Sequence, residues 1–488
     1  MGERLTINPV TRLEGHGKID IFLNDDGDVE EAYFQVTELR GFEKFCIGRP
    51  VEEMPRIVPN ICGVCPTPHN LASTKALDVI YGAAPTPTAK LIRKLQLCAA
   101  YVEDHFLHFF FLGAPDFIVG PDASPKKRNI LGIIEELGVE LAKEVIEVRK
   151  RTRNIIKLIA SKPAHPEGGL PGGVSKGIKE EDRNFILETA NMCVKFAIYA
   201  LKLFKEKVLG RREYLDLIMS DAYTLKTYYM GMVDDYMRQS YYEGMLRIVD
   251  PDGNEIAFFH PREYVEHIAE WVEPWTYVKL NYLRRFGWKG IKEGWDSSLY
   301  RVGPLARYNV CYGMATPLAQ KEHEEMVSLL GKPVHSTLAY HWARLIEALQ
   351  AAEEMQKIAN DPLLTGKDIR NTNYELTGKG VGCLEACRGV LIHDYEVDGK
   401  GIVTRVNLIV ATQHNAAPIA LSVKKAAKAF ISKGRLEDKE GLLNYVEMAF
   451  RAYDPCFGCA THVIPGRMPL MIEIRDSKGT VIDRVSRF

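Results

Sequence analysis

Two Cys-x-x-Cys pairs lie near opposite ends of this chain of 488 residues. Each pair is followed by a histidine; the residues are Cys62, Cys65 and His69, then Cys456, Cys459 and His462. This spacing lets both sulfurs of a pair reach one metal ion from a single turn, and thiolates are soft ligands that suit zinc, nickel, copper(I) or iron–sulfur clusters. If all four bind together, the fold must bring the two ends of the chain to one place.

Several simpler interpretations compete with a catalytic metal site. Either pair alone could be core cysteines or a redox dithiol, but two pairs with trailing histidines favour metal binding. Structural zinc usually closes a small module with ~15–20 residues between pairs, whereas about 390 residues lie between Cys65 and Cys456. The chain also contains polar residues that could carry protons at a catalytic site, namely Glu14, His16, His69, Asp104, Arg388 and Asp454. These features favour catalysis over structural zinc.

The charge and the hydrophobic pattern limit which kinds of partner the protein can bind and where in the cell it can be located. Net charge is −1 and the pI is near 6.9, which argues against nucleic acid or an anionic membrane bound by bulk electrostatics. The first residues lack the apolar stretch of a signal peptide. The longest apolar cluster, 106–112, is far shorter than the ~18 residues of a membrane span. Ten cysteines without an export signal predict reduced thiols and a cytoplasmic protein.

The hydrophobic pattern predicts a mainly α fold, a helix bundle with short peripheral sheets from both chain ends. Alternation and turn residues predict strands over 1–36, a hairpin over 247–259 and strands from 390 onward. Helical periodicity predicts helices over 87–112, 129–160, 183–209, 336–360 and 439–452. Ser336 or Thr337 is the expected N-cap of the fourth of these helices. Because the cysteine pairs lie at opposite ends, one interleaved domain fits better than separate modules.

Longer motifs resemble a known family along nearly the whole chain. The matching motifs are PVTRLEGHG (9–17), LRGFEKF (39–45), ICGVCPTPHNLAS (61–73), YVEDHFLHFF (101–110), HPEGGLPGGVSKG (165–177), YHWAR (340–344), RGVLIHDYEVD (388–398) and DPCFGCATH (454–462). The chain resembles the large (alpha) subunit of NiFe hydrogenases. GFEKFCIGRPVEEMPRIVP narrows the resemblance to the cytoplasmic methyl-viologen-reducing, non-deazaflavin-reducing hydrogenases of methanogens and to sulfhydrogenases.

The resemblance implies a nickel–iron centre. Cys62 and Cys456 would bind nickel terminally, and Cys65 and Cys459 would bridge nickel to an iron that carries carbon monoxide and cyanide. Maturation proteins would install these diatomic ligands. The expected reaction is reversible heterolytic cleavage of dihydrogen, an oxidoreductase activity of hydrogen metabolism and methanogenesis.

The resemblance also implies catalytic groups around the metals. Glu14 would be the first proton relay, although a glutamate in a surface turn is the simpler interpretation. Arg388 would lie above the metals with Asp104 and Asp454 around it, since a buried guanidinium needs carboxylate partners. His69 would donate a hydrogen bond to a cysteine sulfur; the simpler alternative is a core histidine.

Further implications concern a second metal and the end of the chain. Glu43 and His462 would bind a separate magnesium or iron ion. The catalytic domain would comprise residues 1–462, and a maturation endopeptidase would remove residues 463–488 after nickel insertion. That extension is expected to form two strands joined by a turn at 477–479, which would hold the second cysteine pair away from the metals until cleavage.

Three positions depart from the family pattern. The family usually has arginine at Asn60, proline at Cys387 and a more amide-rich run at 412–415. None of these positions is an expected metal ligand, and neither Cys387 nor Cys383 is expected to bind metal. Asn60 and Cys387 place oxygen tolerance in question.

The cysteine count implies partner proteins. Beyond the four motif cysteines too few remain for a chain of iron–sulfur clusters, so a cluster-bearing small subunit is expected. Further candidate partners are heterodisulfide reductase and an electron-transfer subunit. The alternative function is a non-catalytic structural subunit of a redox complex, with its four-cysteine site empty or filled by zinc.

Overall fold

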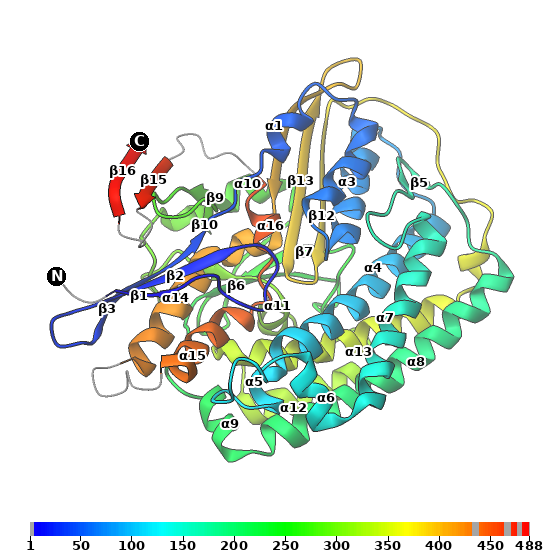
Figure 1. Ribbon diagram of the computed structural model, residues 1–488. Helices are drawn as coiled ribbons and strands as arrows, with labels where there is room; N and C mark the ends of the chain where they lie inside the picture. Colours follow the sequence, from blue (N-terminus) through cyan, green and yellow to red (C-terminus); the bar gives the residue numbers. More distant parts are fainter. Residues whose placement is uncertain (1–3, 432–438, 463–469, 476–480, 488) are drawn as a thin grey trace.

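The computed structural model describes residues 4–431, 439–462, 470–475 and 481–487. Four long helices pack against one another as a bundle (Figure 1). They are α4 (Pro87–Leu107), α7 (Val139–Ala160), α8 (Glu180–Phe204) and α13 (Tyr340–Asn360). Helix α13 contacts both α4 and α8. It is buried on almost every side, which is the environment expected for a helix at the centre of a bundle.

Shorter helices surround this bundle. They are α1 (Phe42–Cys46), α2 (Met54–Ile57), α3 (Pro66–Ile80), α5 (Pro115–Ile118), α6 (Ile130–Leu137), α9 (Arg212–Ile218), α10 (Tyr264–His267), α11 (Pro304–Val310), α12 (Pro317–Leu330), α14 (Ala411–Phe430), α15 (Lys439–Arg451) and α16 (Phe457–Ala460). Local sequence sets many of the helix starts. At α4, for example, Thr86 Oγ1 accepts a hydrogen bond from the Ala89 N–H and Pro87 is the first helical residue.

Small sheets lie around the helices. Two antiparallel sheets have three strands each, in the orders β1 (Arg4–Ile7), β2 (Gly17–Leu23), β3 (Val29–Val36) and β12 (Lys379–Ala386), β13 (Gly389–Val397), β14 (Val403–Ile409). A four-stranded sheet has the order β11 (Tyr300–Arg301), β6 (Tyr228–Val233), β7 (Met245–Val249), β8 (Glu255–Phe259), with β11 parallel to β6. The two-stranded sheets are β4 (Gly169–Leu170) with β5 (Gly173–Val174), β9 (Ile268–Trp271) with β10 (Leu280–Leu283), and β15 (Leu470–Arg475) with β16 (Val481–Arg487).

The predicted mainly α architecture with short sheets is confirmed, with further sheets in the middle of the chain. The strands over 1–36, the 247–259 hairpin and the strands after 390 all form. The predicted strands of the C-terminal extension pair as β15 and β16, whereas their predicted turn lies outside the described residues.

Two predicted helix boundaries are wrong. The expected helix over 129–160 breaks at Gly138, whose φ of +88° is a conformation that glycine adopts readily and that helices do not contain. Apolar residues recur at helical spacing on both sides of Gly138. Hydrophobic periodicity alone could therefore not reveal the break. Ser336 does not cap α13, because its hydroxyl donates to the Ile218 carbonyl and a short 3₁₀ turn precedes Tyr340.

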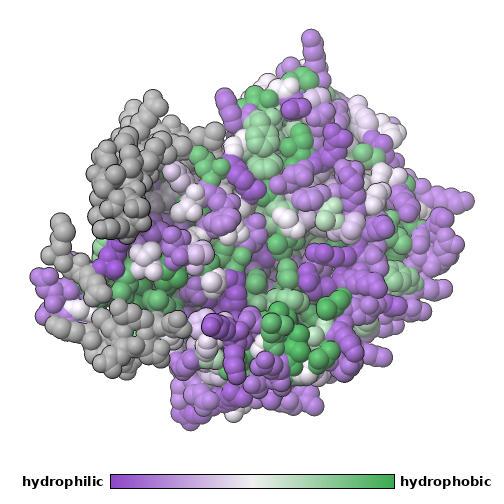
Figure 2. Space-filling model, in the orientation of Figure 1, coloured by the Kyte–Doolittle hydropathy of each residue, from purple (hydrophilic) through white to green (hydrophobic). Residues whose placement is uncertain are grey.

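The two ends of the chain meet beside α14. This helix packs against β3 from the N-terminal sheet and against both α15 and α16 from the C-terminal region. A backbone bridge then joins Glu14 directly to Cys456. No helix among the described residues is long and apolar enough to cross a membrane. Figure 2 shows hydrophilic side chains over most of one face, with hydrophobic ones in separate patches.

Candidate metal centre

The four motif sulfurs meet inside the protein. Sγ of Cys62 lies 3.2 Å from Sγ of Cys456, and Sγ of Cys65 lies 3.3 Å from Sγ of Cys459. All four atoms lie within 4.8 Å of one another, and all four residues are buried. Within the described part of the chain, no other group of three or more histidine, cysteine or acidic side chains is close enough to hold a metal ion. The predicted convergence of the two pairs is confirmed.

The first pair is held by the start of α3. Cys65 precedes this helix, and Pro66 is its first residue, where a missing N–H leaves no helical hydrogen bond unmade. The backbone N–H groups of Val64 and Cys65 both donate to Cys62 Sγ at 3.2 Å. Burial raises the pKa of Cys62, but its hydrogen bonds with the other three thiols lower that pKa well below the ordinary value. The chain therefore favours a thiolate at Cys62.

The second pair is held by the N-terminal loop that contains Glu14. The Phe457 N–H donates to the Glu14 carbonyl at 3.0 Å, and the Glu14 N–H donates to the Pro455 carbonyl at 3.4 Å. These contacts join segments separated by more than 400 residues in sequence. They fix the position of Cys456, which lies between the two bonded residues of its own segment.

Two glycines allow this close approach. Gly15 has a φ of +90°, and a Cβ atom there would lie 2.7 Å from the Gly458 nitrogen. A Cβ atom on Gly458 would lie 2.6 Å from Glu14 Oε1. Arg40 links the motifs further, because its guanidinium donates to the Ile61 carbonyl before the first pair and to the Gly458 carbonyl within the second. A side chain at either glycine would therefore push the two loops apart.

The Glu14 carboxylate lies against the second cysteine pair. Its Oε2 accepts a hydrogen bond from the Gly458 N–H at 3.0 Å and lies 2.9 Å from Cys456 Sγ. Burial raises the pKa of Glu14, and the nearby Cys62 raises it further, while the contacts with Cys456 and Gly458 lower it. A carboxylate with a raised pKa, in direct contact with a metal-binding sulfur, is suited to accept a proton.

Arg388 lies in the turn between β12 and β13 and is buried. Its Nη1 and Nη2 donate to both oxygens of Asp104, at 2.7 and 2.9 Å, and Nη2 lies 2.9 Å from Asp454 Oδ2. Burial lowers the pKa of Arg388, but Asp104 and Asp454 raise it well above the ordinary value. Burial raises the pKa of Asp454 to about 7, against the effect of Arg388. The three predicted residues thus form one ion cluster.

His69 lines the same small cavity as three of the cysteines. Around this cavity lie Cys65, Pro68, His69, Ala386, Arg388, Leu391, Val410, Ala411, Thr412, Cys456 and Cys459. His69 Nδ1 lies 3.1 Å from His393 Nε2. Burial lowers the pKa of His69 to about 4, although Cys62 acts in the opposite direction. His69 is therefore a neutral imidazole near neutral pH.

Glu43 and His462 lie together behind the second cysteine pair. His462 Nε2 is 2.6 Å from the Leu408 carbonyl oxygen and 3.6 Å from Glu43 Oε1, and its Nδ1 is 2.7 Å from the Cys459 carbonyl oxygen. Both ring nitrogens therefore face oxygens, and an imidazole with a single N–H can satisfy only one of them. A cation at Nε2 would remove that conflict, since the Nδ1–H could then donate to Cys459.

The three departures from the family pattern lie in different surroundings. Asn60 is exposed, and its amide donates to the Arg56 and Ile57 carbonyls. Cys387 is buried, 4.0 Å from the Ala100 carbonyl oxygen, and burial raises its pKa well above the ordinary value. In the 412–415 run, Thr412 Oγ1 accepts a hydrogen bond from the Cys456 N–H. Only the last two therefore adjoin the metal centre.

Sequence reasoning missed three residues that shape the site. Arg40 and His393 lie within matched motifs, and Thr412 lies in the 412–415 run that departs from the family pattern, but no local pattern identifies their contacts. Arg40 bonds to residues 21 and 418 positions away, and His393 bonds to a residue 324 positions away. Only the contacts in the folded chain identify them.

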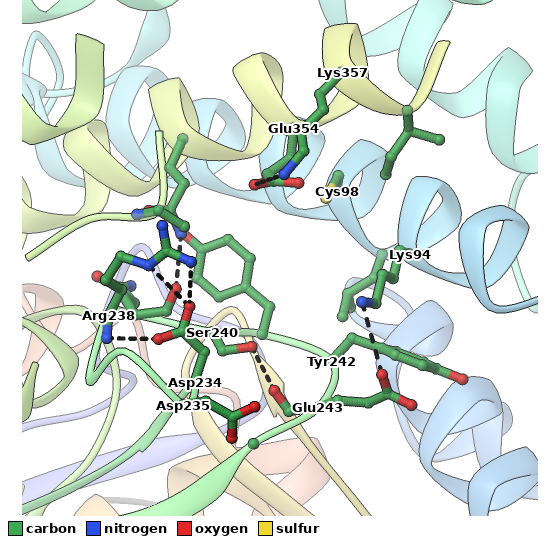
Figure 3. A pocket seen from close by; sticks show the side chains of 17 residues that line it. Lys94, Cys98, Asp234, Asp235, Arg238, Ser240, Tyr242, Glu243, Glu354 and Lys357 are labelled. Carbon is green, nitrogen blue, oxygen red and sulfur yellow. Dashed lines mark hydrogen bonds and ion pairs between the residues drawn. The ribbon is translucent and has the colours of Figure 1, made fainter. Parts of the chain in front are cut away.

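A separate cavity of about 370 Å³ lies between α4, α13 and the segment before β7. Figure 3 shows that most of its charged side chains are paired with one another, whereas Asp235 is drawn without a partner. Asp234 Oδ2 lies 2.8 Å from Arg238 Nη2, and Glu243 Oε2 lies 3.7 Å from Lys94 Nζ. Because each of these pairs neutralises its own charges, the paired groups give the cavity little preference for a charged ligand.

Comparisons with known proteins agree with this site. The family model described as nickel-dependent hydrogenase matches residues 40–127 and 140–462, and a HoxL-like model matches residues 4–39. An F420-non-reducing hydrogenase iron-sulfur subunit of Archaeoglobus profundus is 47% identical over 487 residues, covering 100% of both chains. An F420-non-reducing hydrogenase vhu subunit of Methanocaldococcus jannaschii is 41% identical, over 87% of this chain and 99% of the relative.

A solved structure shows the same fold. The crystal structure of an NAD+-reducing [NiFe]-hydrogenase in the H2-reduced state superposes with a TM-score of 0.87 at 37% identity. The match covers 94% of this chain and 99% of that chain. Family model, relatives and fold agree with the resemblance seen in the motifs, including the narrower one to hydrogenases of methanogens. The chain therefore belongs to the nickel-dependent hydrogenase family.

Proposed function

We propose that this chain is the catalytic large subunit of a NiFe hydrogenase, which splits dihydrogen reversibly into protons and electrons. One observation supports this above all others: four buried sulfurs within 4.8 Å of one another adjoin a carboxylate, Glu14 Oε2, at 2.9 Å from one of them. Structural zinc needs the sulfurs but has no use for a proton acceptor in contact with them. The arrangement supports proton chemistry at the metals.

The donor set fits nickel and iron. Soft thiolates suit both metals. From the family resemblance we propose that Cys62 and Cys456 would bind nickel alone and that Cys65 and Cys459 would be shared between nickel and iron. Cys65, Cys456 and Cys459 line the small cavity described above, whereas Cys62 does not.

The wall of that cavity suits small diatomic ligands. Leu391, Val410 and Ala411 give it an apolar surface, while Arg388 supplies hydrogen-bond donors. Apolar side chains accommodate carbon monoxide, and a guanidinium can donate to a cyanide nitrogen. We therefore propose that iron carries carbon monoxide and cyanide on this side.

The chain itself supplies the route for the proton. When bound, the metal pair supplies the electron-accepting centre at which dihydrogen is split. The Cys456 sulfur is the base beside Glu14, and a proton held there can pass to Oε2 over 2.9 Å, within hydrogen-bond reach. The Gly458 N–H orients that oxygen, and the raised pKa of Glu14 lets the carboxyl group hold the proton before passing it on.

We propose that Arg388 supplies a fixed positive charge at the site, apart from the Glu14 proton route. Its bonds with Asp104 and Asp454 hold the guanidinium rigidly and balance its charge. A preorganised cation of this kind stabilises negative charge that develops nearby without rearranging during the reaction.

We propose a magnesium or iron ion at Glu43 and His462, with the Leu408 carbonyl as a third ligand. A carboxylate and a carbonyl are hard oxygen donors of the kind that magnesium prefers. The ion would tie the end of the catalytic segment, 439–462, to β14. We further propose that a maturation endopeptidase cuts after His462 and leaves residues 1–462 as the catalytic domain.

The relatives are named as subunits of hydrogenases, so this chain is one subunit of a larger enzyme. We propose that its direct partner is an iron–sulfur small subunit, since the described chain holds one cysteine cluster and no second set for an electron path. Further along that path we propose heterodisulfide reductase and an electron-transfer subunit. A cytoplasmic location is also proposed, because the thiolates must stay reduced to bind metal.

Metal content and infrared absorption of the purified complex test this function. The expected result is one nickel per copy of this chain, iron in excess of nickel because the partner carries iron–sulfur clusters, and carbon monoxide and cyanide stretching bands. A Cys65→Ser variant should lose nickel and the stretching bands, while Cys193→Ser, which changes a buried cysteine outside the cluster, should retain both. Zinc in place of nickel, without bands, would overturn the proposal in favour of a non-catalytic structural subunit.

A further inference from the structure

A buried ion cluster joins the loop before Glu14 to the helix before Cys456. Its members are Arg12 from the N-terminal loop, Asp116 from α5, and Glu447 and Arg451 from α15. The side chains of all four are at most 12% exposed. The two cations balance the two carboxylates, so the cluster can stay charged inside the protein.

Arg12 holds the loop from one side. Its Nη2 donates to Asp116 Oδ1 at 2.5 Å and to Asn444 Oδ1 at 3.2 Å, and its Nη1 donates to the Leu112 carbonyl at 2.9 Å. The backbone of Arg12 has a φ of +58°, which residues other than glycine rarely adopt. These contacts therefore hold the loop in a conformation that the isolated segment would disfavour.

Glu447 and Arg451 hold the same loop from the other side. The Thr11 N–H and the Thr11 hydroxyl each donate to the Glu447 carboxylate at 3.0 Å. Arg451 Nη2 donates to the Thr11 hydroxyl oxygen at 3.2 Å, and Arg451 Nε donates to the Thr11 carbonyl at 3.4 Å. Two neighbouring residues of the loop are thus fixed to the C-terminal half of α15.

Asp116 links the two arginines. Arg451 Nη1 donates to its Oδ1 and Oδ2 at 3.1 and 2.8 Å, while Arg12 donates to Oδ1. Burial raises the pKa of Asp116, but Arg12 and Arg451 lower it below the ordinary value, so the carboxylate is ionised at neutral pH. Without this charge, two buried guanidinium groups would lie together with Glu447 alone to balance them.

The cluster lies close in sequence to the contact that is proposed to move the proton. Arg12 is two residues before Glu14, and Arg451 is five residues before Cys456. The direct bridge between Glu14 and Cys456 has two backbone hydrogen bonds, at 3.0 and 3.4 Å, and a glycine without a side chain follows Glu14. An anchor outside the bridge is therefore needed to fix how the two segments lie against each other.

We infer that Asp116 is a positioning residue of the proton relay: it holds Arg12 and Arg451 together and thereby keeps the Glu14 carboxylate against the Cys456 sulfur. This inference rests on the proposed function and extends it to a residue about 100 positions from Glu14 in sequence. Proton transfer requires hydrogen-bond reach, and a displacement of about 1 Å can cost about a hundredfold in rate. A small shift of the N-terminal loop would lengthen the 2.9 Å contact and slow proton release.

Asp116→Asn in the metal-loaded complex tests the inference. Asparagine keeps the size of the side chain but removes the charge that holds the arginines. Dihydrogen oxidation with a viologen dye should fall at least about tenfold in kcat, because proton release slows. The KM for dihydrogen, the nickel content and the infrared bands should stay unchanged. Conversion of para- to ortho-hydrogen should also persist, because it needs splitting and recombination at the metals but no passage of the proton to solvent.

Two substitutions at Arg12 test the same link from the loop. Arg12→Met removes the cation and should lower kcat as Asp116→Asn does. Arg12→Lys keeps a cation that can pair with Asp116, so it should retain more activity than Arg12→Met. These two variants also decide the question if Asp116→Asn fails to fold or to take up nickel.

The matched control is Asp78→Asn. Asp78 is a largely buried carboxylate that accepts hydrogen bonds from the buried Arg93 at 2.5 and 3.1 Å. It lies near the end of α3, whereas Cys65 precedes the start of that helix. Its substitution should lower stability without changing kcat.

Three outcomes would overturn the inference. Wild-type kcat in both Asp116→Asn and Arg12→Met would mean that the cluster does not hold Glu14. A fall in para-to-ortho conversion equal to the fall in kcat would place the damage at the metals, and an equal fall of kcat in Asp78→Asn would attribute it to general destabilisation. Absence of nickel or of dihydrogen turnover from the wild-type complex would instead refute the proposed function, so the two failures are distinguishable.

Discussion

Glu14 contacts Cys456 through both its backbone and its side chain. Its backbone pairs with Cys456, and its carboxylate contacts the sulfur of the same cysteine. The carboxylate is therefore held to the metal ligand by both main chain and side chain. Burial raises the pKa of Glu14, which favours proton uptake over permanent ionisation. The simpler interpretation, a glutamate exposed in a surface turn, does not fit these contacts.

Glu14→Gln should abolish dihydrogen turnover while the metals stay bound. Glutamine keeps the size of the side chain and can still accept a hydrogen bond from the Gly458 N–H, but it cannot carry a proton between groups. Activity with a viologen dye and nickel content measure the two effects. Glu38→Gln is the control, because Glu38 bonds to the exposed His16 rather than to a cysteine. Full activity in Glu14→Gln would show that protons leave by another route.

At the scale of elements, the β12–β13 hairpin presents Arg388 to the metals, and Arg307 from α11 holds its turn. Arg307 donates to the carbonyls of Ala386 and Cys387 at 3.0 and 2.9 Å. The same guanidinium bonds to both oxygens of Glu347, at 2.6 and 2.7 Å, and to Glu385 at 2.5 Å. All three charged groups are buried, so each depends on the others for compensation.

Arg307→Met should destabilise the protein by about 3–5 kcal/mol, because it leaves two buried carboxylates without their cation. The change in the free energy of unfolding can be measured by denaturant titration of the metal-free chain. Arg212→Met is the control: Arg212 is exposed and pairs with Asp216 one turn along α9, so its loss should cost less than about 0.5 kcal/mol. Equal effects of the two substitutions would contradict a structural role for the Arg307 network.

Glu385 should make stability depend on pH. Burial raises its pKa from 4.5 to about 7, although Arg307 opposes the shift. Because the folded chain binds this proton more tightly, the contribution to stability is complete below about pH 4.5 and is lost as the pH rises toward 7.

Glu385→Gln should therefore remove part of the decline in unfolding free energy between pH 4.5 and 7, up to about 3 kcal/mol. Denaturant titrations of the metal-free wild type and variant at several pH values measure the difference between them. Glu140→Gln, at an exposed position on α7, should follow the wild type. Parallel curves for wild type and Glu385→Gln would show that Glu385 is ionised throughout this range.

At the scale of the whole molecule, the metal centre closes the chain on itself. The N-terminal loop, α3 and the segment after α15 each provide part of the site, and none could build it alone. His462 is 1% exposed and contacts β14. The hairpin of β15 and β16 follows directly in sequence.

The C-terminal extension should be absent from active enzyme. Intact mass spectrometry of the nickel-loaded complex should give a chain that ends at His462, because its two nitrogens and the proposed second ion fix that residue inside the protein. Protein from nickel-starved cells should retain residues 463–488. A chain ending at Phe488 in active, nickel-loaded enzyme would mean that no cleavage is needed.

The contact with the partner should be large. Electron transfer requires a cluster near the metals, and an obligate interface buries above about 2,000 Å² in total. The isolated chain should therefore fail to reduce viologen dyes, and adding the cluster-bearing subunit should restore activity. Measurement of dye reduction before and after reconstitution checks this. An active monomer without iron–sulfur clusters would contradict it.

The sequence by itself determined the features that depend on neighbouring residues. The Cys-x-x-Cys spacing defined the ligands, alternation and turn residues defined the hairpins of β2–β3 and β7–β8, and helical periodicity defined α4 and α13. These signals are readable because hydrogen bonds, caps and amphipathic faces involve residues at most a few positions apart. The longer motifs added the family and, with it, the expected roles of Glu14 and Arg388.

Tertiary structure alone decided the contacts that connect distant residues. No local pattern predicts that Arg40 bonds to both cysteine motifs, that Arg307 holds the turn of Arg388, or that His393 sets the surroundings of His69. Each contact joins segments brought together only when the hydrophobic faces of helices and sheets pack. The break at Gly138 belongs here too, because the apolar period continues through it and only the packed backbone shows the turn. Local spacing thus names the ligands, whereas packing supplies the environment that sets their charge and proton positions.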